Sequence, residues 1–79
     1  MNNLHLTQLG ANMTEVRYGD KYVLFSYQTP VSYVELADMN TVYVTDKKYS
    51  ATTSKHISKW VAARKIIKVN QETIDNIVR

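Results

Sequence analysis

Residues 13–27 read Met-Thr-Glu-Val-Arg-Tyr-Gly-Asp-Lys-Tyr-Val-Leu-Phe-Ser-Tyr, and this stretch predicts the fold. Two strand-like runs flank the dipeptide Gly19-Asp20, which suits a two-residue type II′ hairpin turn. When Tyr18 lies opposite Lys21, alternate residues of the two runs share a face. One face then carries Val16, Tyr18, Val23 and Phe25, and the other carries Glu15, Arg17, Tyr22 and Leu24. We expect the first face to lie on the core, because period 2 moves all of its residues together.

Further strands are predicted on both sides of this hairpin. Residues 4–9 alternate apolar and polar side chains, which makes Leu4, Leu6 and Leu9 available to a core, and residues 10–12 form a turn. Thr29-Pro30 interrupts the ladder, because proline lacks the backbone donor that a central strand position needs. Residues 31–36 and 41–45 are rich in β-branched and aromatic side chains and predict a second hairpin around residues 37–40.

The pattern becomes helical after Asp46. Residues 51–54 offer hydroxyl groups for a helix N-cap, and residues 55–65 have helical spacing, with Ile57, Trp60 and Val61 on one face. Arg64 falls inside this apolar stripe, so either its side chain snorkels or the helix ends near Ala63. Residues 66–69 are compatible with a final strand. Asn70 then caps a short helix over residues 71–78, whose inward side chains are Ile74, Ile77 and Val78.

Together these elements predict a single α+β domain over residues 1–79. We expect a small, mainly antiparallel sheet of hairpins packed against one helix, plus a short C-terminal helix. The chain has a net charge of +3, which divides unevenly between its two halves. The strand-rich residues 1–46 carry two basic and five acidic side chains, whereas the helical residues 47–79 carry eight basic and two acidic ones.

The composition argues against enzymatic chemistry and bound cofactors. The chain has no cysteine and only two histidines, His5 and His56, so it lacks the ligands for a typical zinc site. No Gly-x-Ser-x-Gly elbow or glycine-rich phosphate loop is present. Turn formation accounts for the scattered acidic residues. We therefore expect a non-enzymatic protein with no cofactor and no metal, in which His56 forms structural hydrogen bonds at a helix start.

Nothing in the sequence predicts export or a membrane span. Residues 1–5 lack the basic and apolar regions of a signal peptide. The longest uncharged run, Tyr22 to Val34, has 13 residues and contains a proline, which is too short to cross a bilayer.

The acid-free segment 47–68 is the best candidate for a binding surface. It holds seven cationic side chains, and Lys55 and Lys59 repel each other on one helix face unless an anion lies opposite them. The predicted contact residues for nucleic acid or another partner are Lys47, Lys48, Tyr49, Lys55, Lys59 and Lys65. An ordinary solvated helix face and a protein-binding face remain alternatives to nucleic-acid contact.

Two segments resemble a family of small tailed-bacteriophage proteins of unassigned function. The segments are Val-Leu-Phe-Ser-Tyr-Gln-Thr-Pro-Val at residues 23–31 and Tyr-Ser-Ala-Thr-Thr-Ser-Lys-His-Ile-Ser-Lys-Trp at residues 49–60. The resemblance implies a phage-encoded protein that works in the cytoplasm of the infected bacterial host, and it implies no activity. Members of that family tend to end soon after the second motif, so residues 65–79 represent an extension that completes the core, forms a dimer contact or docks a partner.

These observations lead to one functional hypothesis and two alternatives. We expect a binding protein that acts stoichiometrically in the host cell and contacts nucleic acid through residues 47–68. The first alternative is a protein-directed inhibitor of a host system, of the anti-defence or anti-CRISPR type. The second is a homo-oligomeric structural component, such as a homodimer, assembled by pairing of edge strands.

Overall fold

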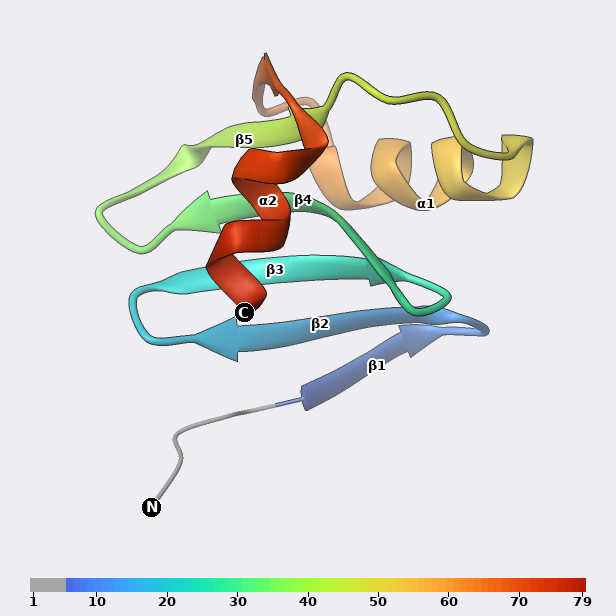
Figure 1. Ribbon diagram of the computed structural model, residues 1–79, viewed down its shortest axis with the longest axis horizontal. Coiled ribbons are helices and arrows are strands. Elements are labelled where there is room, and N and C mark those ends of the chain that lie inside the picture. The colour runs from blue at the N-terminus through green and yellow to red at the C-terminus, as the bar shows by residue number, and fades with distance from the viewer. Residues whose placement is uncertain (1–5) are drawn as a thin grey trace.

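The computed structural model describes residues 6–79, which form six strands and two helices (Figure 1). The elements follow one another as β1 (Leu6–Gly10), β2 (Met13–Tyr18), β3 (Lys21–Ser26), β4 (Thr29–Glu35), β5 (Asp38–Thr45), α1 (Ala51–Val61), β6 (Lys65–Val69) and α2 (Gln71–Val78). This arrangement confirms the expected α+β class with a mainly antiparallel sheet. No helix among these residues is long and apolar enough to span a membrane.

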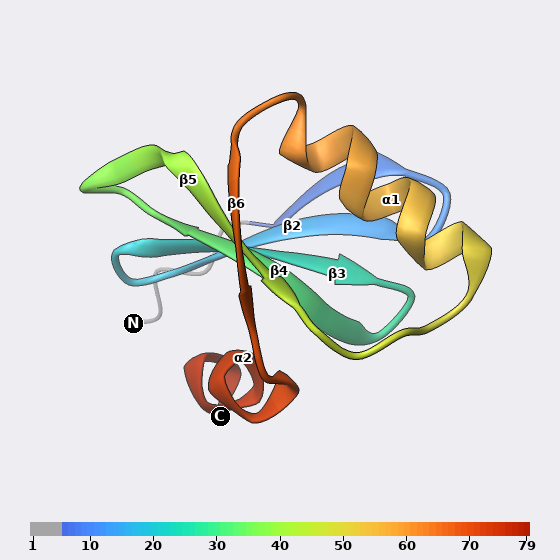
Figure 2. The same cartoon turned by 90° about the horizontal axis from the view of Figure 1, so that it is seen from above.

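The six strands form one sheet in sequence order, from β1 at one edge to β6 at the other. Neighbouring strands are antiparallel except for β5 and β6, which are parallel. Parallel neighbours need a crossover connection, and α1 provides it. The two helices lie on opposite faces of the sheet (Figure 2). The sheet is therefore covered on both sides rather than on one.

The central hairpin has the predicted register. Tyr18 pairs with Lys21 and Val16 with Val23, and Gly19 has a φ of 59°. A positive φ at the first loop position favours glycine, because a side chain there strains the backbone. The second hairpin also forms, but its turn is tighter than predicted, since Glu35 already pairs with Asp38.

The predicted core face of the central hairpin does lie on a core, but the opposite face is buried as well. Tyr22 and Leu24, assigned to the outer face, belong to the larger apolar cluster under α1, which also contains Val42, Trp60 and Val61. The predicted core face packs in a second cluster under α2, built around Val23, Tyr33 and Ile74. Period-2 alternation separates the two faces of a strand, but it does not reveal that a helix covers each of them.

The first strand contributes little to the core. Leu6 is 68% exposed and Leu9 is also exposed, contrary to the prediction, whereas Leu4 and His5 lie outside the described residues. The reason is topological: β1 is an edge strand, while α1 packs on β3 and α2 packs on β4. Neither helix therefore extends far enough to bury the leucines of β1.

Residues 65–79 complete the core, as one of the three options predicted. They form β6 and α2, and Ile74 is fully buried against the sheet. Asn70 caps α2 as expected, because its side chain accepts a hydrogen bond of 2.9 Å from the backbone N–H of Thr73.

Candidate functional site

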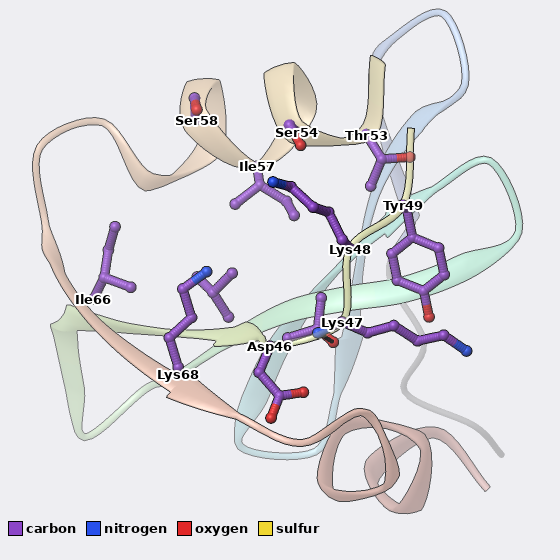
Figure 3. A pocket seen from close by; sticks show the side chains of 12 residues that line it. Asp46, Lys47, Lys48, Tyr49, Thr53, Ser54, Ile57, Ser58, Ile66 and Lys68 are labelled. Carbon is purple, nitrogen blue, oxygen red and sulfur yellow. Dashed lines mark hydrogen bonds between the residues drawn. The ribbon is translucent and has the colours of Figure 1, made fainter. Parts of the chain in front are cut away.

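A basic cleft of about 440 Å³ lies between α1, the loop after β5, and β6. Figure 3 shows that its side chains come from three separate segments of the chain. They are Val44, Thr45, Asp46, Lys47, Lys48, Tyr49, Thr53, Ser54, Ile57, Ser58, Ile66 and Lys68. We call this concavity the α1–β6 cleft.

The loop that carries Lys47, Lys48 and Tyr49 is fixed at both ends. At its start, the Asp46 backbone N–H donates to the Val69 carbonyl at 2.7 Å, and the Lys47 N–H donates to Thr45 Oγ1 at 3.1 Å. At its end, Ser50 caps α1, because its hydroxyl oxygen accepts from the Thr53 N–H at 3.2 Å. These bonds hold the two lysines of the loop in place between β5 and α1.

Helix α1 is anchored to the sheet by polar as well as apolar contacts. Ser26 Oγ lies 2.9 Å from Thr53 Oγ1 and 2.7 Å from His56 Nδ1. At the other end of the helix, Trp60 Nε1 donates to Glu15 Oε1 at 2.8 Å. His56 forms a structural hydrogen bond, as expected from the sequence, but it lies in the middle of α1 rather than at its start, because the helix already begins at Ala51.

Ser26 Oγ and His56 Nδ1 lie within hydrogen-bond distance of each other, as a serine nucleophile and its general base do in some enzymes. Ser26 is only 2% exposed, and its hydroxyl also contacts Thr53. No lining residue of the α1–β6 cleft other than Thr53 belongs to this network. The buried Ser26 hydroxyl, through its contacts with Thr53 and His56, attaches α1 to the sheet.

The lysines of the cleft have no carboxylate partner among the described residues. The ion pairs found in residues 6–79 involve Lys21, which contacts Asp20 at 3.1 Å and Glu35 at 3.9 Å. In Figure 3, the side chains of Lys48 and Lys68 extend toward α1 from opposite sides of the cleft, while the Asp46 carboxylate points away from the helix. The first turn of α1 also contains no acidic residue. The cleft therefore presents positive charge to solvent.

Tyr49 is half-buried beside these lysines, and the ammonium of Lys47 lies 5.5 Å from its ring centroid. Burial raises the pKa of the Tyr49 phenol, and the negative charge of Asp75 raises it further. The phenol therefore stays protonated at neutral pH and adds no negative charge to the cleft.

The structure brings together only half of the predicted contact residues. Lys47, Lys48 and Tyr49 line the cleft. Lys55 and Lys59 are exposed on α1 but are not part of the cleft lining. Lys65 lies on the opposite face of β6 from Lys68, because successive residues of a strand point to opposite faces.

Sequence reasoning missed Lys68, Ile66 and Ser58 as lining residues. The parallel register pairs Ile66 with Val42 and Lys68 with Val44, both of which belong to the cluster under α1. The sequence was compatible with a final strand at residues 66–69, but the face that each residue of this strand occupies depends on the long-range pairing with β5. No local signal could have supplied it.

Arg64 belongs to the same basic segment but has a structural role. The helix ends at Val61, and the Arg64 guanidinium donates to the carbonyls of Val61 and Met39, each at 3.1 Å. It also lies 5.3 Å from the centroid of the Trp60 ring. The guanidinium therefore hydrogen-bonds carbonyl groups at the end of α1 and near the start of β5. Of the two predicted alternatives for Arg64, a snorkelling side chain or an early helix end, the structure shows the early helix end.

Within residues 6–79 there is no cluster of three or more histidine, cysteine or acidic side chains that could hold a metal ion. The α1–β6 cleft offers an anionic ligand the ammonium groups of its lysines and the hydroxyls of Ser54 and Ser58, together with apolar side chains.

Comparison with known proteins gives a family and no function. Residues 3–76 match the model of a family of unknown function, DUF8033. The match continues through β6 and into α2, so the segment after Trp60 lies within the family's domain as far as residue 76. No curated protein and no solved structure matches the chain. Because the family model covers nearly the whole chain, the protein belongs to this family of unknown function, DUF8033.

Proposed function

We propose that this protein is a non-enzymatic nucleic-acid-binding protein whose contact surface is the α1–β6 cleft. The observation that carries the proposal is the gathering of Lys47, Lys48 and Lys68 around one concavity with no carboxylate partner among the described residues. Ammonium groups that face solvent together are favourable opposite phosphates, because binding releases the counterions condensed on the nucleic acid.

The surroundings of the cleft support the same ligand. Lys55 and Lys59 are exposed on α1 and add positive potential near the cleft without lining it. The exposed hydroxyls of Ser54 and Ser58 lie along the helix side of the cleft and can donate to phosphate or base oxygens.

Binding that depends on phosphate contacts is sensitive to salt, and this gives the first prediction. With about three lysine–phosphate contacts, the logarithm of the association constant should fall with the logarithm of salt concentration with a slope of about −2 to −3. Fluorescence anisotropy with labelled oligonucleotides measures this slope. Absence of binding to every oligonucleotide at low salt would overturn the proposal.

The biological setting is proposed on the resemblance of residues 23–31 and 49–60 to small tailed-phage proteins. On that basis the protein is phage-encoded, acts in the cytoplasm of the infected host and binds its target stoichiometrically.

A second candidate function, a protein-directed inhibitor of a host system, is favoured by a different surface. An uncharged groove of about 380 Å³ lies beside edge strand β1 and includes the exposed Leu6 and Tyr27 with the half-buried Phe25. Exposed apolar surface beside an unpaired strand edge suits a protein partner, including a second copy of the chain in a homo-oligomer. Affinity purification before and after nuclease treatment separates the candidates: loss of bound material favours nucleic acid, and retention of one defined protein favours the inhibitor.

A further inference from the structure

The α1–β6 cleft combines two kinds of surface that a phosphate site alone does not need. Three of its lining side chains are aliphatic (Val44, Ile57 and Ile66), while others are lysines and hydroxyl-bearing residues. Ile66 is 49% exposed, so apolar surface remains open to solvent inside the cleft. These aliphatic side chains do not stabilise a bound free phosphate, because apolar surface stabilises a ligand only when the ligand also has apolar surface to bury.

An unpaired nucleobase matches this composition. It has an apolar face, a polar edge that pairs with hydroxyl groups, and a phosphate on either side. The hydroxyls of Ser54 and Ser58 lie on the helix side of the cleft, and Lys48 and Lys68 extend into it from two other segments (Figure 3). A nucleobase packed on the aliphatic side chains of the cleft would thus have its flanking phosphates near ammonium groups.

A duplex matches the cleft poorly. Its bases are stacked and paired inside, and proteins reach them by inserting a helix or a β-ribbon into a groove. The α1–β6 cleft is a concavity between elements. A duplex would therefore touch only its outer edge and leave the aliphatic side chains of the cleft exposed.

We propose that the α1–β6 cleft recognises single-stranded polynucleotide, with an unpaired base against Ile57 and Ile66 and phosphates at Lys48 and Lys68. This inference rests on the nucleic-acid function proposed above. It adds that the ligand must be unpaired at the site of contact, and it applies to DNA and RNA alike, since both present the same base faces and phosphates.

The experiment compares three labelled probes at about 50 mM salt by fluorescence anisotropy. The probes are a DNA strand of about 16 nucleotides without self-complementarity, the RNA of the same sequence, and the DNA duplex. We expect at least one single strand to bind about ten times more tightly than the duplex. Equal or tighter duplex binding overturns this inference and leaves the nucleic-acid function standing, whereas no binding of any probe overturns both.

Two isoleucines on neighbouring positions of β6 provide a matched pair of variants. Ile66 lines the cleft, whereas Ile67 pairs with Tyr43 and faces the α2 side of the sheet. Both are exposed, at 49% and 38%, so replacing either with serine leaves the core intact. Ile66→Ser should weaken single-strand binding about fivefold and leave duplex binding unchanged, and Ile67→Ser should change neither. Equal effects of the two substitutions on single-strand binding would overturn the placement of the nucleobase against Ile66.

Discussion

Reversing two charges of the α1–β6 cleft, with Lys48→Glu and Lys68→Glu in one variant, should weaken nucleic-acid binding on the order of 100-fold at low salt. The two side chains extend into the cleft from separate segments, so both phosphate contacts are lost and replaced by repulsion. The salt slope should also become less negative by about 1.5, because two fewer counterions are released. Anisotropy titrations at several salt concentrations measure both quantities.

The control for this variant has the same charge change elsewhere. Lys65→Glu with Arg79→Glu lowers the net charge of +3 by the same amount, but Lys65 lies on the opposite face of β6 and Arg79 follows α2. We expect this control to lose only a few-fold in affinity, since its effect acts at a distance and is screened. If both double variants lose binding equally, overall charge rather than the cleft is responsible.

Replacing Ile74 with alanine should destabilise the protein by about 3 kcal/mol, the second large effect that we expect. Ile74 is fully buried between α2 and the sheet, where it packs with Val23 and Tyr33. Its truncation removes buried methyl groups and leaves a cavity in the smaller of the two apolar clusters. In a domain of this size, the melting temperature should fall by more than about 10 °C.

Urea unfolding of Ile74→Ala, compared with Ile67→Ala, separates core packing from the loss of side-chain volume. Ile67 undergoes the same chemical change while 38% exposed on an edge strand, so its cost should stay below about 1 kcal/mol. The milder Ile74→Val, with an expected cost of about 1 kcal/mol, keeps the comparison measurable if the alanine variant does not fold. Equal costs at positions 74 and 67 would mean that α2 does not pack on the sheet.

Local signals in the sequence were sufficient to predict most of the strands and helices. Gly19-Asp20 predicted the turn and register of the central hairpin, and Asn70 predicted the start of α2. The burial of the two sheet faces was harder to predict, because Tyr22 and Val23 are adjacent residues that pack in different apolar clusters, one under each helix. A sequence pattern with period 2 assigns one face to a core, and here both faces are core.

The candidate site was predictable where its residues are consecutive and not where they come from distant segments. Lys47, Lys48 and Tyr49 were identified from the acid-free run and lie together. Lys68 reaches the same cleft only because α1 returns the chain parallel to β5, whereas Lys65, three residues earlier, faces the other side. Charge counting along the sequence could not separate these two lysines, because their difference arises from the strand pairing.

The most direct test of the α1–β6 cleft as the binding surface is an NMR titration of the isotopically labelled protein with a single-stranded oligonucleotide. We expect the largest amide shifts in the loop at residues 46–49, along the cleft side of α1 at Ser54 and Ser58, and at Lys68, with little change at β1. Shifts confined to β1 and the uncharged groove around Phe25, with residues 46–49 and Lys68 unmoved, would contradict the proposal.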